Sequence, residues 1–204
     1  MFASEPAAGQ LPGPILGVDP GLSRCGYGAV RREGSALRAI ACGVVRTPPT
    51  DELPGRLAAL SGELESLVAE VCPSVVVVER VLFQVNARTA IAVGQASGVA
   101  LAAAARAGIP VVHYSPNEVK LAVTGHGGAD KAQVSAMVAR LLTLSHIPGP
   151  PDAADALALA ICHAGAGRVR AAVDRSSDHR ERGGGPVRGY ERAVAAALAR
   201  EAAR

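Results

Sequence analysis

The chain has 204 residues, of which 49% are apolar, and a formal net charge of +3. This length suffices for one catalytic domain with a sizeable core, and no run of 18 uncharged apolar residues suggests a membrane span. Aromatic residues make up only 2% and the four cysteines are scattered singly, which argues against extensive base stacking, a zinc knuckle and a disulfide framework.

The charge is unevenly distributed along the chain. Residues 1–166 carry 12 Lys/Arg and 13 Asp/Glu, whereas residues 167–204 carry nine arginines and five acids. The N-terminus lacks the basic start and apolar stretch of a signal peptide, so we expect a cytoplasmic protein with no membrane partner. We expect a flexible tail at 1–13, one folded domain at 14–166 and a basic, flexible C-terminal tail at 167–204.

The first half of the chain predicts a β-meander followed by a crossover. Short apolar segments predict strands at 15–19, 26–30 and 37–45. Leucines and valines at steps of three and four then predict an amphipathic helix over 53–71. The valine run at 75–79 predicts a central strand, and the preceding helix has the length of a crossover that pairs this strand in parallel with 15–19.

The second half predicts mainly helices. The pattern indicates helices at 86–107 and 130–144, with a short strand at 109–114 between them. Pro150, Pro151 and Asp152 form a strong start for a further helix. From Gly165 onward the regular pattern fades, and we expect no chemistry in the tail.

Four carboxylates stand at the ends of apolar segments. Asp19 and Glu79 each close a predicted strand, while Asp152 and Asp155 open the last helix with a spacing that puts both on one face. An acid at the end of a buried segment is held at the edge of the core, where loss of water costs several kcal/mol unless a partner compensates. A lysine or arginine is one such partner, and Arg80 directly follows Glu79.

A hard divalent ion is the other partner for these acids. All-oxygen ligation favours magnesium or manganese over zinc. Two such ions clamp the attacking and leaving oxygens of a phosphodiester during cleavage. The four acids therefore indicate a metal-dependent nuclease, and their mutual repulsion without metal predicts a raised pKa for at least one of them.

Motifs in this order resemble the RuvC family of crossover junction endodeoxyribonucleases. They are ILGVDPG at 15–21 with GYG at 26–28, VERV at 78–81, GQASG at 94–98 and DAADAL at 152–157. The resemblance covers roughly residues 14–165 and implies an α/β, ribonuclease H-like fold. That fold has a mixed sheet, in which an antiparallel three-strand meander is joined to parallel strands, flanked by helices.

The resemblance also implies the activity. The family resolves Holliday junctions by paired symmetric nicks in homologous recombination and DNA repair, and works as a homodimer. Its cofactor is Mg²⁺ or Mn²⁺, with two ions expected per active site. Four-way junction DNA and the RuvA–RuvB branch-migration complex are the implied partners.

Site residues are carried over by position. The resemblance makes Asp19, Glu79, Asp152 and Asp155 the catalytic residues and metal ligands. For Lys120 and Lys131, the only lysines in the chain, it implies either phosphate contact or neutralisation of charge in the transition state. The alternative is that both are ordinary solvated lysines on the surface, with no role in the site.

Two further candidates for DNA contact follow the second motif. The family carries an aromatic residue three positions after the glutamate of this motif, where this chain has Leu82, with Phe83 one step on. Either Phe83 stacks on a junction base from a shifted loop, or base contact is weaker and Phe83 packs as an apolar residue. Arg88 is the second candidate.

Some motifs allow more than one interpretation. Gly94, Gly98 and Ala102 permit close approach of helices, and we expect them to pack a dimer rather than to form a phosphate loop. His126 lies in a glycine-rich segment that is either a phosphate contact or a plain hinge. His163 is expected to be a core histidine, or one that supports the acids.

Two other function classes remain open at this point. The opening hairpin also resembles the phosphate-binding hairpin of actin-like ATPases and sugar kinases, which suggests a phosphotransferase fragment. Those folds need a second domain of similar size, for which this chain is too short. A non-catalytic ribonuclease H-like module would be expected to lose acids, and none is lost.

Overall fold

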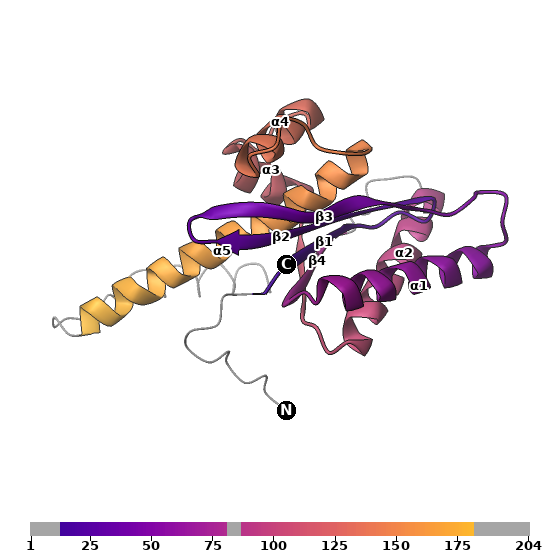
Figure 1. Cartoon of the computed structure of the whole chain (residues 1–204), viewed down its shortest axis with the longest axis horizontal. Coiled ribbons are helices and arrows are strands. Elements are labelled where there is room, and N and C mark those ends of the chain that lie inside the picture. The colour runs from indigo at the N-terminus through magenta and orange to yellow at the C-terminus, as the bar shows by residue number, and fades with distance from the viewer. Residues whose placement is uncertain (1–12, 81–86, 182–204) are drawn as a thin grey trace, which may run out of the picture. The chain divides into compact units, whose positions relative to one another are not determined.

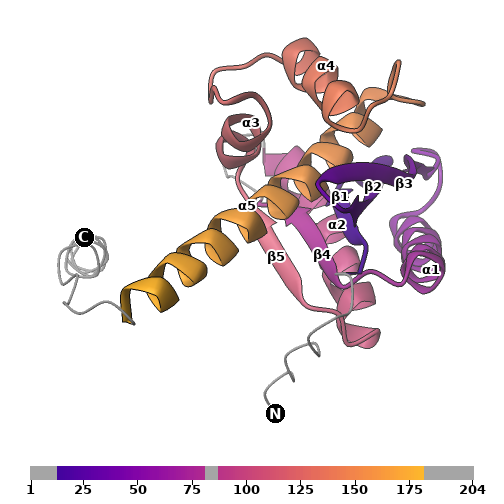
Figure 2. The same cartoon turned by 60° about the vertical axis from the view of Figure 1, so that its left-hand side comes forward.

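The computed structural model describes the backbone of residues 13–80 and 87–181, and the side chains of 13–80 and 89–166. The chain divides into two units after Ala166, and the first unit contains the whole sheet. Five strands form this sheet in the order β3-β2-β1-β4-β5 (Figures 1 and 2). They are β1 Ile15–Asp19, β2 Arg24–Glu33, β3 Ala36–Arg46, β4 Val75–Glu79 and β5 Val111–Tyr114.

The sheet is mixed, as predicted. Strand β1 pairs antiparallel with β2, and β2 pairs antiparallel with β3, which makes the meander. Strand β4 pairs in parallel with both β1 and β5. The valine run of β4 is therefore central, and its four valines are buried, as expected for a strand covered on both faces.

Five helices are present in the described residues. They are α1 Leu53–Val71, α2 Ala87–Arg106, α3 Pro116–Thr124, α4 Lys131–Leu141 and α5 Pro151–Glu181. None of them is long and apolar enough to cross a membrane. Helices α1, α2 and α4 and the start of α5 were predicted, whereas α3 was not.

Several boundaries differ from the prediction. Strands β2 and β3 are longer, spanning 24–33 and 36–46 rather than 26–30 and 37–45. Helix α4 ends at Leu141 rather than 144, because Thr143 takes a left-handed conformation with φ of 58°. Strand β5 begins at Val111 rather than 109, because the Ile109 N–H bonds back to the Ala104 carbonyl at the end of α2. Helix α5 continues to Glu181, past Gly165, where the sequence pattern fades.

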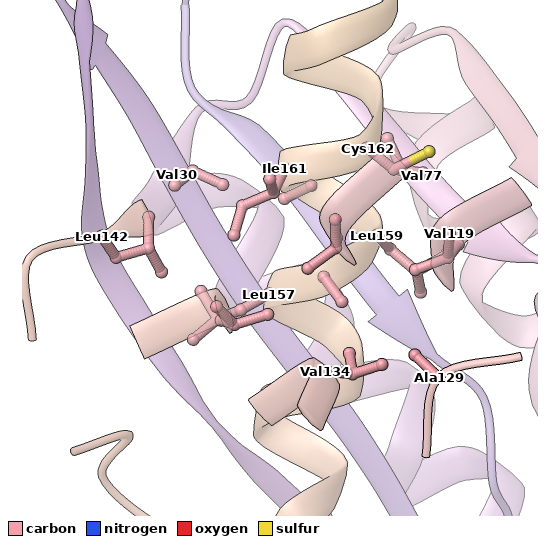
Figure 3. Close-up of a cluster of buried hydrophobic side chains, with 14 of the residues drawn as sticks. Val30, Val77, Val119, Ala129, Val134, Leu142, Leu157, Leu159, Ile161 and Cys162 are labelled. Carbon is pink, nitrogen blue, oxygen red and sulfur yellow. The ribbon is translucent and has the colours of Figure 1, made fainter. Parts of the chain in front are cut away.

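Two apolar cores lie on opposite faces of the sheet. Leu16 and Val18 of β1 pack in the core formed with α1 and α2. The alternate valines Val75 and Val77 of β4 pack instead with α3, α4 and α5 (Figures 2 and 3). Side chains alternate along a strand, so Glu79, two residues after Val77, lies on the face covered by α3, α4 and α5. Asp19 of β1 lies on the same face, two residues after Gly17.

Three glycines let α5 lie directly on the sheet. A Cβ atom on Gly17 would come within 2.0 Å of the Ala156 carbonyl oxygen, and one on Gly26 within 2.2 Å of the Asp152 carbonyl oxygen. Gly28, the cross-strand partner of Gly17, would meet Leu157 at 2.7 Å. Any side chain at these positions would lift the helix, so the glycines hold the start of α5 at backbone distance from β1 and β2.

Candidate active site

Asp19 and Glu79 lie side by side at the ends of the two central strands. Gly17 is paired with Val77, and Val18 with Val78, in the parallel register of β1 and β4. Asp19 and Glu79 follow these pairs, so they lie at the edge of the sheet where both strands end. Both are on the face of the sheet that α5 covers. The adjacency predicted from the sequence is confirmed.

Helix α5 brings its acids to the same edge. Asp155 lines a cleft of about 160 Å³ together with Asp19 and Glu79. Lys120 of α3 and Lys131 of α4 line it as well, so two cations and three acids converge there from five different elements. The rest of the lining is Pro116, Val119, Val134, Ala158 and Leu159.

Asp152 is not in the lining of this cleft, and is held by an arginine at its rim. The Nε and Nη2 groups of Arg24 both donate to Oδ2 of Asp152, the first at 3.0 Å. Arg24 is the first residue of β2 and stands two residues before Gly26, on the same face of the strand. Arg24 was not predicted as a site residue. Its position two residues before Gly26 could have placed it on the face of β2 that α5 covers.

Asp155 has a cation of its own. The Lys131 ammonium donates to Oδ2 of Asp155 at 3.0 Å. This hydrogen bond is the main reason that the pKa of Lys131 is raised, with the charge of Asp155 second. Asp152 and Asp155, the two predicted site acids of α5, are therefore both compensated by protein groups.

The strand-end acids carry the electrostatic strain. Burial raises the pKa of Asp19 most, followed by the charges of Glu79, Asp155 and Asp152, and together these effects bring it from its ordinary value to about 7. Burial and then the charge of Asp155 raise the pKa of Glu79 as well. Lys131 opposes both shifts without cancelling them. The expectation of at least one raised pKa is confirmed.

The donor set fits a hard divalent cation. It consists of carboxylate oxygens only, and Lys131 compensates the charges of the two strand-end acids only in part. In the described part of the chain, no group of three or more His, Cys, Asp or Glu side chains is arranged to hold a metal ion as it stands. Arg24 and Lys131 occupy one oxygen each of Asp152 and Asp155, and these oxygens would have to be released before they could bind a metal ion.

The structure places only some of the predicted DNA contacts. Lys120 and Lys131 lie in the cleft lining. Leu82, Phe83 and the side chain of Arg88 lie outside the described residues.

Two histidines lie apart from the cleft lining. The His163 Nδ1 atom shares a hydrogen bond of 3.1 Å with the hydroxyl of Tyr114, and the two rings meet edge to face. Tyr114 is the cross-strand partner of Glu79 on β5, so His163 supports the edge of the sheet that carries the acids. The backbone carbonyl of His126 accepts a hydrogen bond from the hydroxyl of Thr124 in the turn after α3.

A mixed sheet in this strand order, with acids at two central strand ends and on the helix across them, defines a nuclease of the ribonuclease H-like class. Comparison with known proteins gives the family. The chain matches the family described as "Crossover junction endodeoxyribonuclease RuvC" over residues 15–163. RuvC of Salinispora arenicola is 58% identical over 172 residues, which are 84% of this chain and 98% of that protein.

Solved structures agree with this match. The structure of Thermus thermophilus RuvC is 36% identical, with a TM-score of 0.72, covering 76% of this chain and 96% of that one. The T. thermophilus RuvC in complex with Holliday junction substrate is also 36% identical, with a TM-score of 0.73, covering 76% and 95%. The chain belongs to the RuvC family, and it is an endonuclease that resolves Holliday junctions. Neither a phosphotransferase fragment nor a non-catalytic module is favoured.

Proposed function

We propose that Asp19, Glu79, Asp152 and Asp155 are the catalytic metal ligands of this metal-dependent endonuclease. The observation that carries this proposal is the convergence of Asp19, Glu79 and Asp155 on one cleft, with the pKa of Asp19 raised to about 7 by burial and by its acidic neighbours. A divalent ion relieves that repulsion, because it brings the positive charge that the protein supplies only in part.

The metal is Mg²⁺ or Mn²⁺, with two ions per site in this proposal. When bound, they supply an activated water and charge stabilisation at the phosphodiester. The chain's own residues hold and orient the reacting groups. Lys120 and Lys131 line the cleft from α3 and α4, where their ammonium groups offset the charge of the scissile phosphate and of its neighbour.

Paired symmetric nicks require two such sites, and we assign the dimer contact to the outer face of α2. Ile91 is 62% exposed on this helix. Gly94 and Gly98 follow it at helical spacing, both are exposed, and a Cβ atom on either would meet nothing within 4 Å. A stripe of small and apolar residues on a surface helix is the kind of face that a second copy covers.

The cellular setting follows from the same proposal. A junction resolvase works on chromosomal DNA, so we place it in the cytoplasm. Its partners are four-way junction DNA and, through the family, the RuvA–RuvB branch-migration complex.

Cleavage assays on three substrates test the activity and the site together. The purified protein is incubated with a synthetic four-way junction, a linear duplex and an RNA–DNA hybrid, each with magnesium or with EDTA. We expect paired nicks in the junction with magnesium alone. Equal cleavage of the duplex would contradict junction selectivity, and cleavage in EDTA would contradict the metal site.

Acid variants then assign the residues. Asp19→Asn, Glu79→Gln, Asp152→Asn and Asp155→Asn should each lower the cleavage rate on the order of a hundredfold, with junction binding retained. Glu63→Gln on the exposed face of α1 is the matched control and should cleave normally. Near-normal turnover of any one active-site variant would remove that residue from the site.

A further inference from the structure

Arg24 contacts an acid of the proposed site but was not predicted to belong to it. It begins β2, on the sheet face that α5 covers, and its side chain is 45% exposed. Two of its donor groups bond the same oxygen, Oδ2 of Asp152. Arg24 therefore contacts an acid of the site directly while half of its side chain remains open to solvent.

The geometry sets Arg24 in competition with a divalent cation. An oxygen that accepts two guanidinium hydrogen bonds has little lone-pair density left for a metal ion, and the arginine adds a positive charge beside it. Lys131 makes a single contact from a side chain that is 81% exposed, so its partner is freed more easily. The double contact from Arg24 is the firmer of the two.

We propose that Arg24 is a positioning residue that holds Asp152 in the metal-free enzyme and gives it up when a divalent ion binds. The pair keeps Asp152 oriented toward the site and lowers the affinity of the free protein for metal. Once released, the guanidinium stands at the rim, where it contacts a phosphate of the bound DNA. Metal and DNA then favour the same released state of Arg24, which couples their binding.

The proposal rests on the assignment of Asp152 as a metal ligand, and Mn²⁺ binding to the full-length protein tests both. Free Mn²⁺ is measured by electron paramagnetic resonance during titration without DNA, for the parent and for Arg24→Gln. We expect Arg24→Gln to bind Mn²⁺ about five- to tenfold more tightly, because the competing cation is gone. Affinity that is unchanged or weaker would overturn the proposal.

Arg31→Gln is the control for the effect of losing one positive charge from the protein. Arg31 lies on the same strand, is exposed, and pairs with Arg38 of β3 at the other end of the β2–β3 ladder. It loses the same charge away from the site, so its Mn²⁺ affinity should match the parent. An equal gain in both variants would mean that net charge, and not the contact with Asp152, sets the affinity.

The background Asp152→Asn separates the two hypotheses. If Arg24 acts through Asp152, the gain from Arg24→Gln should vanish in this background. If Asp152→Asn alone binds Mn²⁺ as tightly as the parent, the ligand assignment is wrong. If Asp152→Asn weakens binding but Arg24→Gln brings no gain in the otherwise unchanged protein, only the role of Arg24 is wrong.

A second variant and a second measurement complete the test. Arg24→Lys keeps the charge but loses the double contact, so its Mn²⁺ affinity should lie between those of the parent and of Arg24→Gln. If Arg24→Gln does not fold, Arg24→Lys replaces it in the test, and an affinity no higher than that of the parent would overturn the proposal. Junction binding with and without Ca²⁺ measures the coupling. We expect Ca²⁺ to tighten junction binding less in Arg24→Gln than in the parent, and an equal effect would exclude the phosphate contact.

Discussion

Asp19, at the end of β1, lies in an electrostatic conflict that Asp152 and Asp155 of α5 avoid. The backbone of β1 carries it into a buried position, yet its charge has three acidic neighbours. Asp152 and Asp155 escape this conflict because an arginine and a lysine pair with them. The strain of the metal-free site is therefore concentrated at the strand ends.

Asp19→Asn should stabilise the metal-free protein. The pKa of Asp19 is about 7 in the folded state, above its ordinary value of 3.8, so the native state binds a proton more tightly than the unfolded chain. The parent therefore loses stability as the pH rises from about 4 to 7, whereas asparagine cannot ionise. In EDTA at pH 8 we expect a gain on the order of 2 kcal/mol, or about 4–8 °C in melting temperature.

Thermal unfolding at pH 5 and pH 8 checks the sign. The gain should be smaller at pH 5 and should shrink further toward pH 4. Asp155→Asn is the matched comparison and should gain nothing, because it breaks the pair with Lys131. A lower melting temperature for Asp19→Asn at pH 8 would mean that protein groups already compensate this carboxylate.

The sequence predicts the four acids but not their partners. An acid that closes an apolar run is visible in the pattern, because burial of the run fixes where the acid must lie. The pairing of Asp152 with Arg24 depends on the position of the start of β2 relative to α5, and no local sequence pattern predicts this position. For Asp155 the same holds, since Lys131 reaches it only because α4 begins beside the cleft.

At the scale of elements, the site depends on how closely α5 packs on the sheet. Gly17 and Gly26 leave no room for a side chain beneath the helix. Asp152 and Asp155 belong to α5. Their distance from Asp19 is therefore set by the contact between the backbones of α5 and the sheet, and not by side chains that could adapt. A small lift of α5 would open the site.

Gly17→Ala should destabilise the fold and the site together. The added methyl group would lie 2.0 Å from the Ala156 carbonyl oxygen, and neither backbone can move without loss of packing. We expect a loss of about 3 kcal/mol or more in urea unfolding, with cleavage reduced at least as strongly as in an acid variant.

The control is Gly62→Ala on α1. Nothing lies within 4 Å of its added carbon, so it should stabilise the helix by about 0.5–1 kcal/mol. If Gly17→Ala unfolds at the urea concentration of the parent, the close packing of α5 on the sheet is wrong.

Element boundaries show where sequence patterns stop being sufficient. Long periodic segments such as α1 were predicted to the residue, because their apolar stripe has no alternative burial. Helix α3 was missed because it is short, although Ser115 and Glu118 form a capping box that the sequence displays. The end of α4 depends on the left-handed conformation of Thr143, and the start of β5 on the hydrogen bond from Ile109 to Ala104. No apolar pattern indicates either feature.

For the whole molecule, the proposed dimer is the first property to test. Gly98→Arg places bulk and charge on the exposed face of α2, where the monomer itself has space. We expect a folded monomer by light scattering at micromolar concentration, with single rather than paired nicks. Gly62→Arg makes the same change on α1 and should remain dimeric. A dimeric Gly98→Arg would place the interface elsewhere.

Deletion of residues 167–204 should spare the chemistry. The tail carries nine arginines and five acids, while every side chain of the cleft precedes it. We expect metal-dependent nicking at low salt to persist, with weaker junction binding and a shallower dependence of log Kd on log salt. Loss of cleavage at saturating protein and low salt would show that the tail belongs to the catalytic domain.

The parallel pairing of β1 with β4 and the late position of α5 have a consequence for synthesis. The meander of β1, β2 and β3 is local and can form as soon as it leaves the ribosome, whereas β4 must wait for α1, and α5 for nearly all of the domain. The four proposed metal ligands are drawn from residues 19 to 155, so under this proposal an incomplete chain has no active site. We therefore expect the nuclease to be inactive during synthesis and to gain its proposed site only when α5 docks.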